Sequence, residues 1–469
     1  MLARIALCLV VVAAAMGVAN AQPRPSGSTP EALPAQCRGQ PDEKLTALEK
    51  RRQKLERAVA RLRDAFGTAS DGEAKALSKS QEQLLQVLFQ IDCARLRAKL
   101  AGAPGAAPVK PSFAEAPAPA PPPTRSLRKT HSAAPVRAGS EQNNAVEVTT
   151  YFATNRGRTT SDDPAEAYDA TVSALSYGRA VVSIPATHTS GNLELPSIWR
   201  LQFQADPRRH FVLKSATPLD VNSVRAEMAS RLGSAKSKSL LVFVHGYNMS
   251  FAETAMRTAQ LAYDLNFPGI PFFFSWPSEG SVTGYLRDAE SAQLSEDALD
   301  HVLDDLAALP ATDVYVIAHS MGSRVVSQVL KSRVDKGKPV ARLSELLLAA
   351  PDINADLFRT VIAPRLKSLQ GTQTTVYASS TDLALMASKA VHGYRRVGET
   401  AGGVFVYPGM ETIDASAAAM AVRAFGHSYL TDSAAVLKDI QAILKQKLSA
   451  RQRGLAQAGS SPNFYWSLR

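Results

Sequence analysis

Short apolar runs alternate with amphipathic segments over residues 146–450. Six runs are almost continuously apolar, which is typical of strands that a parallel sheet buries on both faces. They are Leu240–Val244, Phe272–Phe274, Val314–Ala318, Leu346–Ala350, Thr374–Ala378 and Val404–Tyr407. Helical periodicity recurs around 250–265, 288–309, 322–335, 353–363 and 382–391, and further strands are expected near 146–153, 179–184, 198–204 and 210–213. Repeated β-α units predict a mostly parallel central sheet with helices on both faces.

A different pattern precedes this block. Within residues 37–100, apolar side chains recur at three- and four-residue steps, with a break at 68–72. This spacing predicts a helical hairpin or coiled-coil pair with charged outer faces. Residues 101–145 then turn to Ala and Pro, a composition that disfavours a packed core and favours an extended spacer.

The first residues resemble a secretory signal peptide. A basic start is followed by the apolar run Ile5–Met16 and by the small-residue cleavage site Ala19–Ala21. We predict that residues 1–21 are removed and that the Pro- and Ser-rich segment 22–36 is a linker. An uncleaved anchor is the alternative, but the apolar run is short for the ~20 residues of a membrane span. The mature chain is therefore expected in the periplasm or outside the cell.

Removing that leader leaves two cysteines, Cys37 and Cys93. An even pair in an exported chain is a disulfide candidate. Two unpaired thiols or a link between chains are the alternatives.

Composition changes this picture little. The apolar fraction of 45% and the charged fraction of 20% are ordinary for a globular protein, and the net charge of +11 favours solubility and weak attraction to anionic surfaces. The sequence has no zinc-finger spacing, basic zipper or RNA-binding signature, so nucleic acid is not expected as a partner.

The sharpest chemical signal lies where the run Val314–Ala318 ends. Ser320 follows this run and directly precedes a helical segment, which is the context of a nucleophile elbow. The turn needs small residues two positions before and after the serine, and Ala318 and Gly322 supply them. Alanine stands where glycine is usual. We predict that Ser320 is a nucleophile.

An oxyanion hole is expected beside it. The run Leu240–Val244 ends in His245-Gly246-Tyr247-Asn248. Backbone N–H groups of Tyr247 and Met321 are the predicted donors to the developing oxyanion. We interpret His245 as a structural residue that orients this loop.

The general base should follow the nucleophile in the sequence. His427 lies at the head of the final helix, whereas His392 precedes a Gly-rich loop, so we assign His427. Asp382 and Asp352 both follow predicted strands and are the candidate acids. We favour Asp382, and the other aspartate would then cap a helix. The acid should fix the imidazole tautomer.

Motifs around these residues resemble an esterase/lipase-like α/β-hydrolase family that is catalogued as a domain of unknown function. The motifs are Tyr151–Arg156, Tyr177-Gly178, Val182–Pro185, Phe243–Asn248, Ser275–Ser278, Ala318–Gly322, Ala350–Asp352 and Tyr377–Ser380. The resemblance covers residues 146–440 and implies an α/β-hydrolase fold with a triad. It implies little about the substrate. We place the hydrolase domain at 146–450 and a C-terminal tail at 451–469.

Together these observations predict an exported serine hydrolase that acts on a small-molecule or lipid ester through an acyl-enzyme. No metal or organic cofactor is expected, since no Cys/His/Asp cluster suggests one. Trp276, Tyr285 and Asn248 are candidate pocket residues, although the aromatics could equally belong to the core. Two alternatives stay open: an amidase or peptidase with the same triad, and a non-catalytic scaffold whose hairpin binds an envelope or protein partner. The oligomeric state is not predicted.

Overall fold

The computed structural model describes residues 45–64, 83, 87, 90, 145–195, 206–235, 237–280, 284–338, 342–382, 384–385, 388–389, 394–400, 402–420 and 429–468. The predicted signal peptide, Cys37, Cys93, His392, His427 and the expected strand at 198–204 lie outside these residues.

One sheet organises the described part of the hydrolase region. Its strands are β1 (Val146–Arg158), β2 (Tyr168–Ile184), β3 (Val212–Leu219), β4 (Ser239–Val244), β5 (Ile270–Ser275), β6 (Asp313–His319), β7 (Leu343–Ala349), β8 (Gln373–Ala378), β9 (Glu411–Asp414), β10 (Ala456–Ser460) and β11 (Asn463–Ser467). The spatial order is β10-β11-β9-β8-β7-β6-β4-β5-β1-β2-β3. All pairings from β1 to β11 across the middle are parallel, while β2, β3 and β10 pair in antiparallel fashion. The predicted mostly parallel sheet is confirmed.

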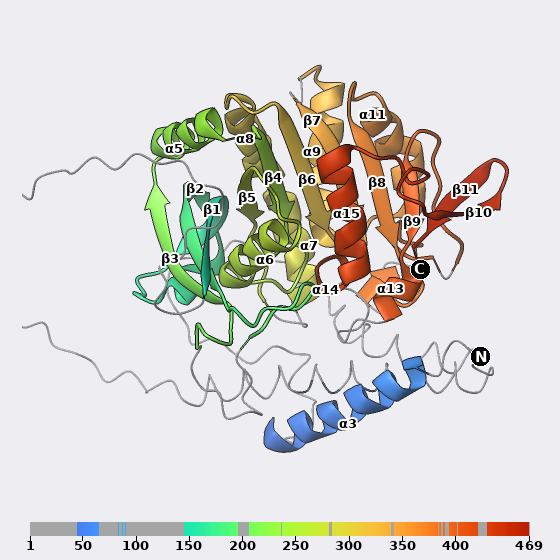
Figure 1. Ribbon diagram of the computed structural model, residues 1–469, viewed down its shortest axis with the longest axis horizontal. Coiled ribbons are helices and arrows are strands. Elements are labelled where there is room, and N and C mark those ends of the chain that lie inside the picture. Colours follow the sequence, from blue (N-terminus) through green and yellow to red (C-terminus); the bar gives the residue numbers. More distant parts are fainter. Residues whose placement is uncertain are drawn as a thin grey trace, which may run out of the picture.

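Helices cover both faces of this sheet (Figure 1). They are α5 (Val221–Ser234), α6 (Phe251–Asp264), α7 (Tyr285–Leu294), α8 (Glu296–Ala307), α9 (Met321–Asp335), α10 (Ala355–Leu357), α11 (Ala363–Lys367), α13 (Ser416–Met420), α14 (Tyr429–Asp432) and α15 (Ala434–Gln446), with a 3-10 turn η2 (Pro164–Glu166) and a π turn η5 (Phe358–Ile362). Apolar residues of α6 and α15 pack on one face, and those of α5, α8 and α9 pack on the other. The central strands β4 and β5 are buried along their whole length, which explains their continuous apolar runs.

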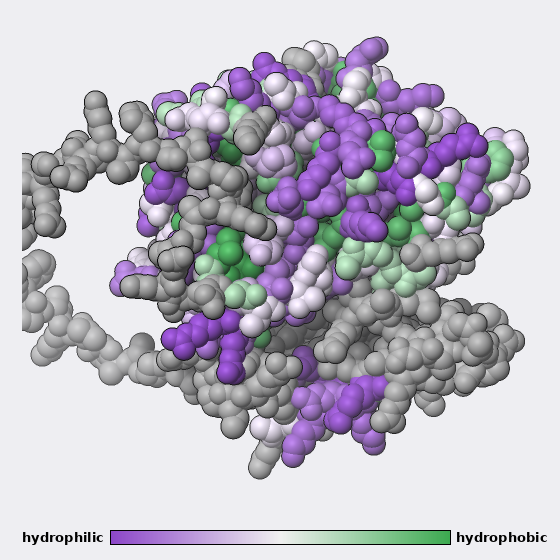
Figure 2. All heavy atoms as spheres, viewed as in Figure 1, coloured by the Kyte–Doolittle hydropathy of each residue, from purple (hydrophilic) through white to green (hydrophobic). Residues whose placement is uncertain are grey.

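The N-terminal region contains α3 (Leu45–Asp64), a helix of 20 residues within the predicted hairpin. None of the helices in the described ranges combines the length and apolarity that crossing a membrane requires. On the face shown in Figure 2, polar side chains cover most of the described surface and apolar ones form small groups between them.

Three sequence assignments need correction. The segment Val404–Tyr407 is not a strand, and the last strand of the predicted series is instead β9. The C-terminal residues 451–469 are not a simple tail, because β10 and β11 form a hairpin and Trp466 of β11 pairs with Ile413 of β9. The sheet therefore extends past residue 450. The helix expected at 288–309 is two helices, α7 and α8.

Candidate active site

Ser320 lies in a strained turn between β6 and α9. Its backbone has φ +52° and ψ −118°, a left-handed value that L side chains rarely adopt. Its N–H donates to the carbonyl oxygen of Ala349 at 2.8 Å, and its own carbonyl accepts from Asp352 N–H at 3.2 Å. The side chain makes no cap hydrogen bond to α9. A sharp strand-to-helix turn of this kind is the geometry of a nucleophile elbow.

Two glycines bring the neighbouring loop close to this turn. A Cβ on Gly246 would lie 2.8 Å from Cβ of Ser320, and a Cβ on Gly322 would lie 2.3 Å from the carbonyl oxygen of His245. Neither distance is sterically tolerable. The backbone after β4 can therefore lie directly against the elbow only because both positions lack a side chain.

The predicted oxyanion donors lie on the two sides of this contact. Met321 is the first residue of α9, where backbone N–H groups have no partner within the helix. Tyr247 follows Gly246 on the facing loop. Asn248, next in the chain, has φ +56°, and its N–H donates to Oδ2 of Asp288 at 3.1 Å. Asn248 thus shapes the loop through its backbone.

His245 is part of the support of that loop. It is fully buried, its Nδ1 lies 2.7 Å from the carbonyl oxygen of Gly246, and its Nε2 lies 3.1 Å from that of Trp276. Burial and the nearby charge of Arg156 lower the pKa of His245 well below its usual value, so the imidazole is neutral. The structural interpretation of His245 agrees with this geometry.

Trp276 belongs to the same support rather than to an open pocket. It is fully buried, its ring stacks on His245 at 4.8 Å between centroids, and its indole N–H donates to the carbonyl oxygen of His245 at 2.8 Å. The sequence assigned Trp276 to the substrate pocket. In the structure Trp276 is instead a core residue, because neither its ring faces nor its N–H group is exposed.

A buried arginine that the sequence reasoning did not single out ties this loop together. Arg156 is 2% exposed, and it donates to Oγ of Ser275 at 2.8 Å and to the carbonyl oxygens of Ser278 at 2.9 Å and Met249 at 2.6 Å. Burial lowers its pKa to about 10, while Asp288 opposes the shift. Arg156 remains charged at neutral pH. It joins the loop that follows β4, called the oxyanion loop below, to the segment that follows β5.

The two candidate acids have different surroundings. Both carboxylate oxygens of Asp352 are occupied: Oδ2 accepts from the Tyr285 hydroxyl at 2.5 Å, while Oδ1 accepts from Ser388 Oγ at 2.5 Å and lies 3.1 Å from Nε of Arg396. The sequence assigned Tyr285 to the pocket. Its ring also meets Tyr247 edge to face at 5.4 Å, so it lies between the loop and Asp352.

Asp382 is fully buried after β8, and its Oδ1 accepts the Leu385 N–H at 3.0 Å. Burial and the nearby Asp382 carboxylate raise the pKa of Tyr429 well above its usual value. Tyr429 begins α14 and lies two residues after His427 in the chain. Asp382 is thus close to the element that follows the predicted base.

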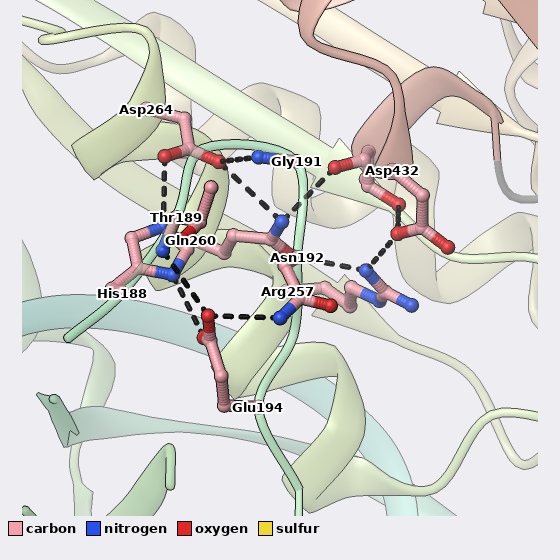
Figure 3. Close-up of polar contacts among 10 residues, drawn as sticks. His188, Thr189, Gly191, Asn192, Glu194, Arg257, Gln260, Asp264 and Asp432 are labelled. Carbon is pink, nitrogen blue, oxygen red and sulfur yellow. Dashed lines mark hydrogen bonds and ion pairs between the residues drawn. The ribbon is translucent and has the colours of Figure 1, made fainter. Parts of the chain in front are cut away.

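A polar network holds α14 against α6 (Figure 3). Gln260 of α6 donates to the carbonyl oxygen of Thr431 at 3.0 Å, and Arg257 forms an ion pair with Asp432. Gln260 also reaches Oδ2 of Asp264 at 3.4 Å, a carboxylate that binds a buried histidine. The network therefore runs from the helix after the predicted base to the loop that follows β2.

That histidine is His188. Its Nδ1 lies 2.8 Å from Oε2 of Glu194 and its Nε2 lies 2.9 Å from Oδ1 of Asp264, so both ring nitrogens face carboxylates. Burial favours the neutral ring, but the hydrogen bonds and charges of Asp264 and Glu194 outweigh it and raise the pKa of His188. The two carboxylates therefore favour the imidazolium form of His188.

The stability contributed by His188 should depend on pH. A raised pKa in the folded state contributes stability that is full below about pH 6.5 and is lost as pH rises through the folded-state pKa. We expect His188→Gln to reduce the free energy of unfolding by about 2 kcal/mol at pH 6, the scale of a charge-assisted hydrogen bond, and by clearly less at pH 9. Urea denaturation at both pH values measures this, with exposed His301→Gln as the control. A deficit equal at both pH values would contradict it.

No group of three or more His, Cys, Asp or Glu side chains in the described ranges is arranged to hold a metal ion.

Comparisons with known proteins agree with this architecture. A family described as alpha/beta hydrolase of unknown function (DUF900) matches residues 220–446. An uncharacterized protein from Nostoc sp. (strain PCC 7120) is 37% identical over 73 residues, which are 15% of this chain and 19% of that protein. The chain therefore matches only about a fifth of the length of this relative.

Several solved structures resemble this chain, but with low sequence identity and low TM-scores. Carboxyl esterase 2 from Tuber melanosporum is 11% identical over 45% of this chain and 79% of its own, with a TM-score of 0.27. An esterase from Pyrobaculum calidifontis is 12% identical over 49% and 94%, with a TM-score of 0.24, and one from Pseudomonas putida is 13% identical over 57% and 77%, with a TM-score of 0.27. These scores carry no argument about activity. The strand order, the elbow and the family match together show that this chain has an α/β-hydrolase fold, and its residues 220–446 match a family of unknown function.

Proposed function

We propose that this α/β hydrolase is an exported serine hydrolase that cleaves carboxylic esters. Ser320 is the nucleophile, His427 the general base and Asp382 the residue that orients the base. Ser320 Oγ attacks the ester carbonyl carbon while its proton passes to His427. The tetrahedral intermediate then expels the alcohol, which takes that proton, and water hydrolyses the acyl-enzyme.

The observation that carries the proposal is the backbone of Ser320. A non-glycine residue at φ +52° between a buried strand and a helix stores strain that persists only because the surroundings over-determine it. In this proposal the strain serves the chemistry, because a turn of this kind exposes the hydroxyl at the start of the helix and leaves Met321 N–H as an oxyanion donor. Close packing of Gly246 and Gly322 brings Tyr247 to the facing side. Two backbone donors flanking one serine favour acyl transfer.

Asp382 is preferred over Asp352 because of its position beside α14. Asp352 already accepts two hydroxyls and an ion pair from Arg396. Asp382 is buried beside α14, which begins two residues after His427. The proposal that residues 1–21 direct export rests on the sequence pattern, and it is tested by mapping the N-terminus of the mature protein, expected at Gln22.

Labelling with a fluorophosphonate probe tests the nucleophile. We expect a covalent adduct on Ser320 in the wild type, none in Ser320→Ala, and labelling slowed by about 10³-fold or more in His427→Ala. Ser332→Ala, on the same helix but near its far end, should label normally. Labelling that persists in Ser320→Ala would contradict the assignment. Comparing 4-nitrophenyl acetate with 4-nitroacetanilide then separates esterase from amidase activity.

A further inference from the structure

A buried ion pair between Asp352 and Arg396 lies next to the elbow, and its arginine has N–H donors without an acceptor. Asp352, whose N–H binds the carbonyl of Ser320, pairs through its carboxylate with Nε of Arg396 at 3.1 Å. Both side chains are buried, with Arg396 5% exposed. Arg396 is therefore connected to the nucleophile through a single residue, Asp352.

The chain around Arg396 is fixed against the end of the sheet. Val397 N–H donates to the carbonyl of Ile353 at 3.0 Å, and Gly398 N–H donates to that of Pro351 at 3.0 Å. A Cβ on Gly398 would lie 2.6 Å from the backbone of Ala350. The backbone of this segment is thus packed against the turn that follows β7.

The hydrogen bonds in this cluster are unevenly distributed. Asp352 accepts from two hydroxyls, those of Tyr285 and Ser388, besides its ion pair. Arg396 contributes that ion pair, yet its Nε and Nη2 have no hydrogen-bond acceptor of good geometry in the described part of the chain. A guanidinium carries five N–H donors, and leaving a buried charged donor unsatisfied is costly. An anionic acceptor supplied by a ligand would remove this cost.

We propose that Arg396 forms a subsite for a carboxylate carried by the substrate. The proposal rests on the proposed function and gives its substrate class: esters with a second, anionic group. Arginine suits this role because the N–H donors of Nη2 can bind a carboxylate while Nε keeps the pair with Asp352. Tyr285 joins the subsite to the oxyanion loop, since its hydroxyl binds Asp352 and its ring packs on Tyr247.

The other nearby charges do not replace this role. Lys389 pairs with Glu399 at 3.0 Å and is 39% exposed, so its charge is compensated and screened. Arg395 is exposed and donates to the carbonyl of Gly403. Among the described charges of this segment, Arg396 combines burial, proximity to Ser320 and unused donors.

Matched pairs of esters test the subsite. Monomethyl glutarate and methyl pentanoate differ by a terminal carboxylate on the acyl side, and 3-carboxyphenyl butyrate and phenyl butyrate differ by one on the alcohol side. We expect kcat/KM to favour the anionic member of one pair by about 10-fold or more in the wild type. In Arg396→Gln this ratio should fall about 10- to 100-fold through KM, while Arg396→Lys should retain part of it and Arg395→Gln all of it.

Folding is controlled separately. The double variant Arg396→Gln/Asp352→Asn removes both buried charges, and its ratio of anionic to neutral kcat/KM should match that of Arg396→Gln. Equal hydrolysis of both members of each pair by the wild type would overturn the proposal, as would a ratio unaffected by Arg396→Gln. A ratio that falls as far in Arg395→Gln would also overturn it.

A second readout needs no turnover. Glutarate should raise the melting temperature of Ser320→Ala and should not raise that of Ser320→Ala/Arg396→Gln. An equal shift, or none in either protein, would overturn the subsite. Failure of the hydrolase proposal has a different signature: the wild type would hydrolyse none of the four esters and would not label with fluorophosphonate, whatever glutarate does.

Discussion

Replacing Asp382 with asparagine should lower kcat/KM for 4-nitrophenyl acetate by about 10⁴-fold, the scale known for loss of the orienting carboxylate in serine proteases. The carboxylate fixes the tautomer of the base and stabilises the imidazolium as the proton moves. An asparagine can present its NH₂ group instead and select the wrong tautomer. Because Asp382 is fully buried, water cannot take over this role. Steady-state kinetics, normalised to correctly folded protein, measure the effect.

Asp352→Asn is the matched comparison, since it makes the same chemical change after the neighbouring strand. Asparagine keeps a single acceptor oxygen, so it retains only one of the hydrogen bonds from Tyr285 and Ser388, and it leaves Arg396 buried without its counter-ion. The expected result is a loss of about 3 kcal/mol in stability with turnover of a neutral ester reduced by no more than about tenfold. The opposite pattern, with turnover abolished in Asp352→Asn and kept in Asp382→Asn, would transfer the role of acid to Asp352.

The central strands were predictable from sequence because burial on both faces leaves an almost purely apolar run. Strand β9 broke this rule. Its Glu411 is partly buried and forms an ion pair with Arg453, a partner 42 residues later. The apolar segment before it, Val404–Tyr407, contains Phe405, which is buried by packing on Phe358 at 5.3 Å without pairing in the sheet. The apolar residues of this segment correctly predicted burial, but they did not predict whether the segment pairs in the sheet.

The C-terminal hairpin was missed for a related reason. Residues 456–460 have the sequence Ala-Gln-Ala-Gly-Ser, which carries little strand propensity. They form β10 because β11 lies beside them, and β11 is fixed in turn by Trp466 and Ser467 pairing with β9. Tertiary pairing overrode local preference.

The same distinction between local and long-range contacts applies to the candidate site. The elbow at Ser320 and its neighbour Gly322 were predictable because a tight turn restricts residues within two positions of each other. Arg156 was not, although it ends the motif Tyr151–Arg156, because its partners Ser275 and Met249 lie about a hundred residues away. Arg396 had no local signal at all, since only the folded chain brings it to Asp352.

The same close packing makes Gly246→Ala a severe test of the oxyanion hole. The added methyl would lie 2.8 Å from Cβ of Ser320 and 3.0 Å from Nδ1 of His319, so the loop after β4 must move away from the elbow. That movement displaces Tyr247, the second proposed donor. Loss of one oxyanion donor lowers kcat by about 10²–10³-fold, and we expect a fall in kcat of this size with a smaller change in KM.

Gly233→Ala is the control, because this glycine lies in α5 with nothing within 4 Å of an added methyl. It should leave kcat unchanged and raise stability by up to about 1 kcal/mol, since alanine restricts the unfolded chain and favours a helix. Steady-state kinetics and urea denaturation of both variants separate a local steric effect from a general effect of a methyl group. A Gly246→Ala enzyme with wild-type kcat would mean that the loop carrying Tyr247 supplies no oxyanion donor. The second donor beside Met321 N–H would then have to come from another residue.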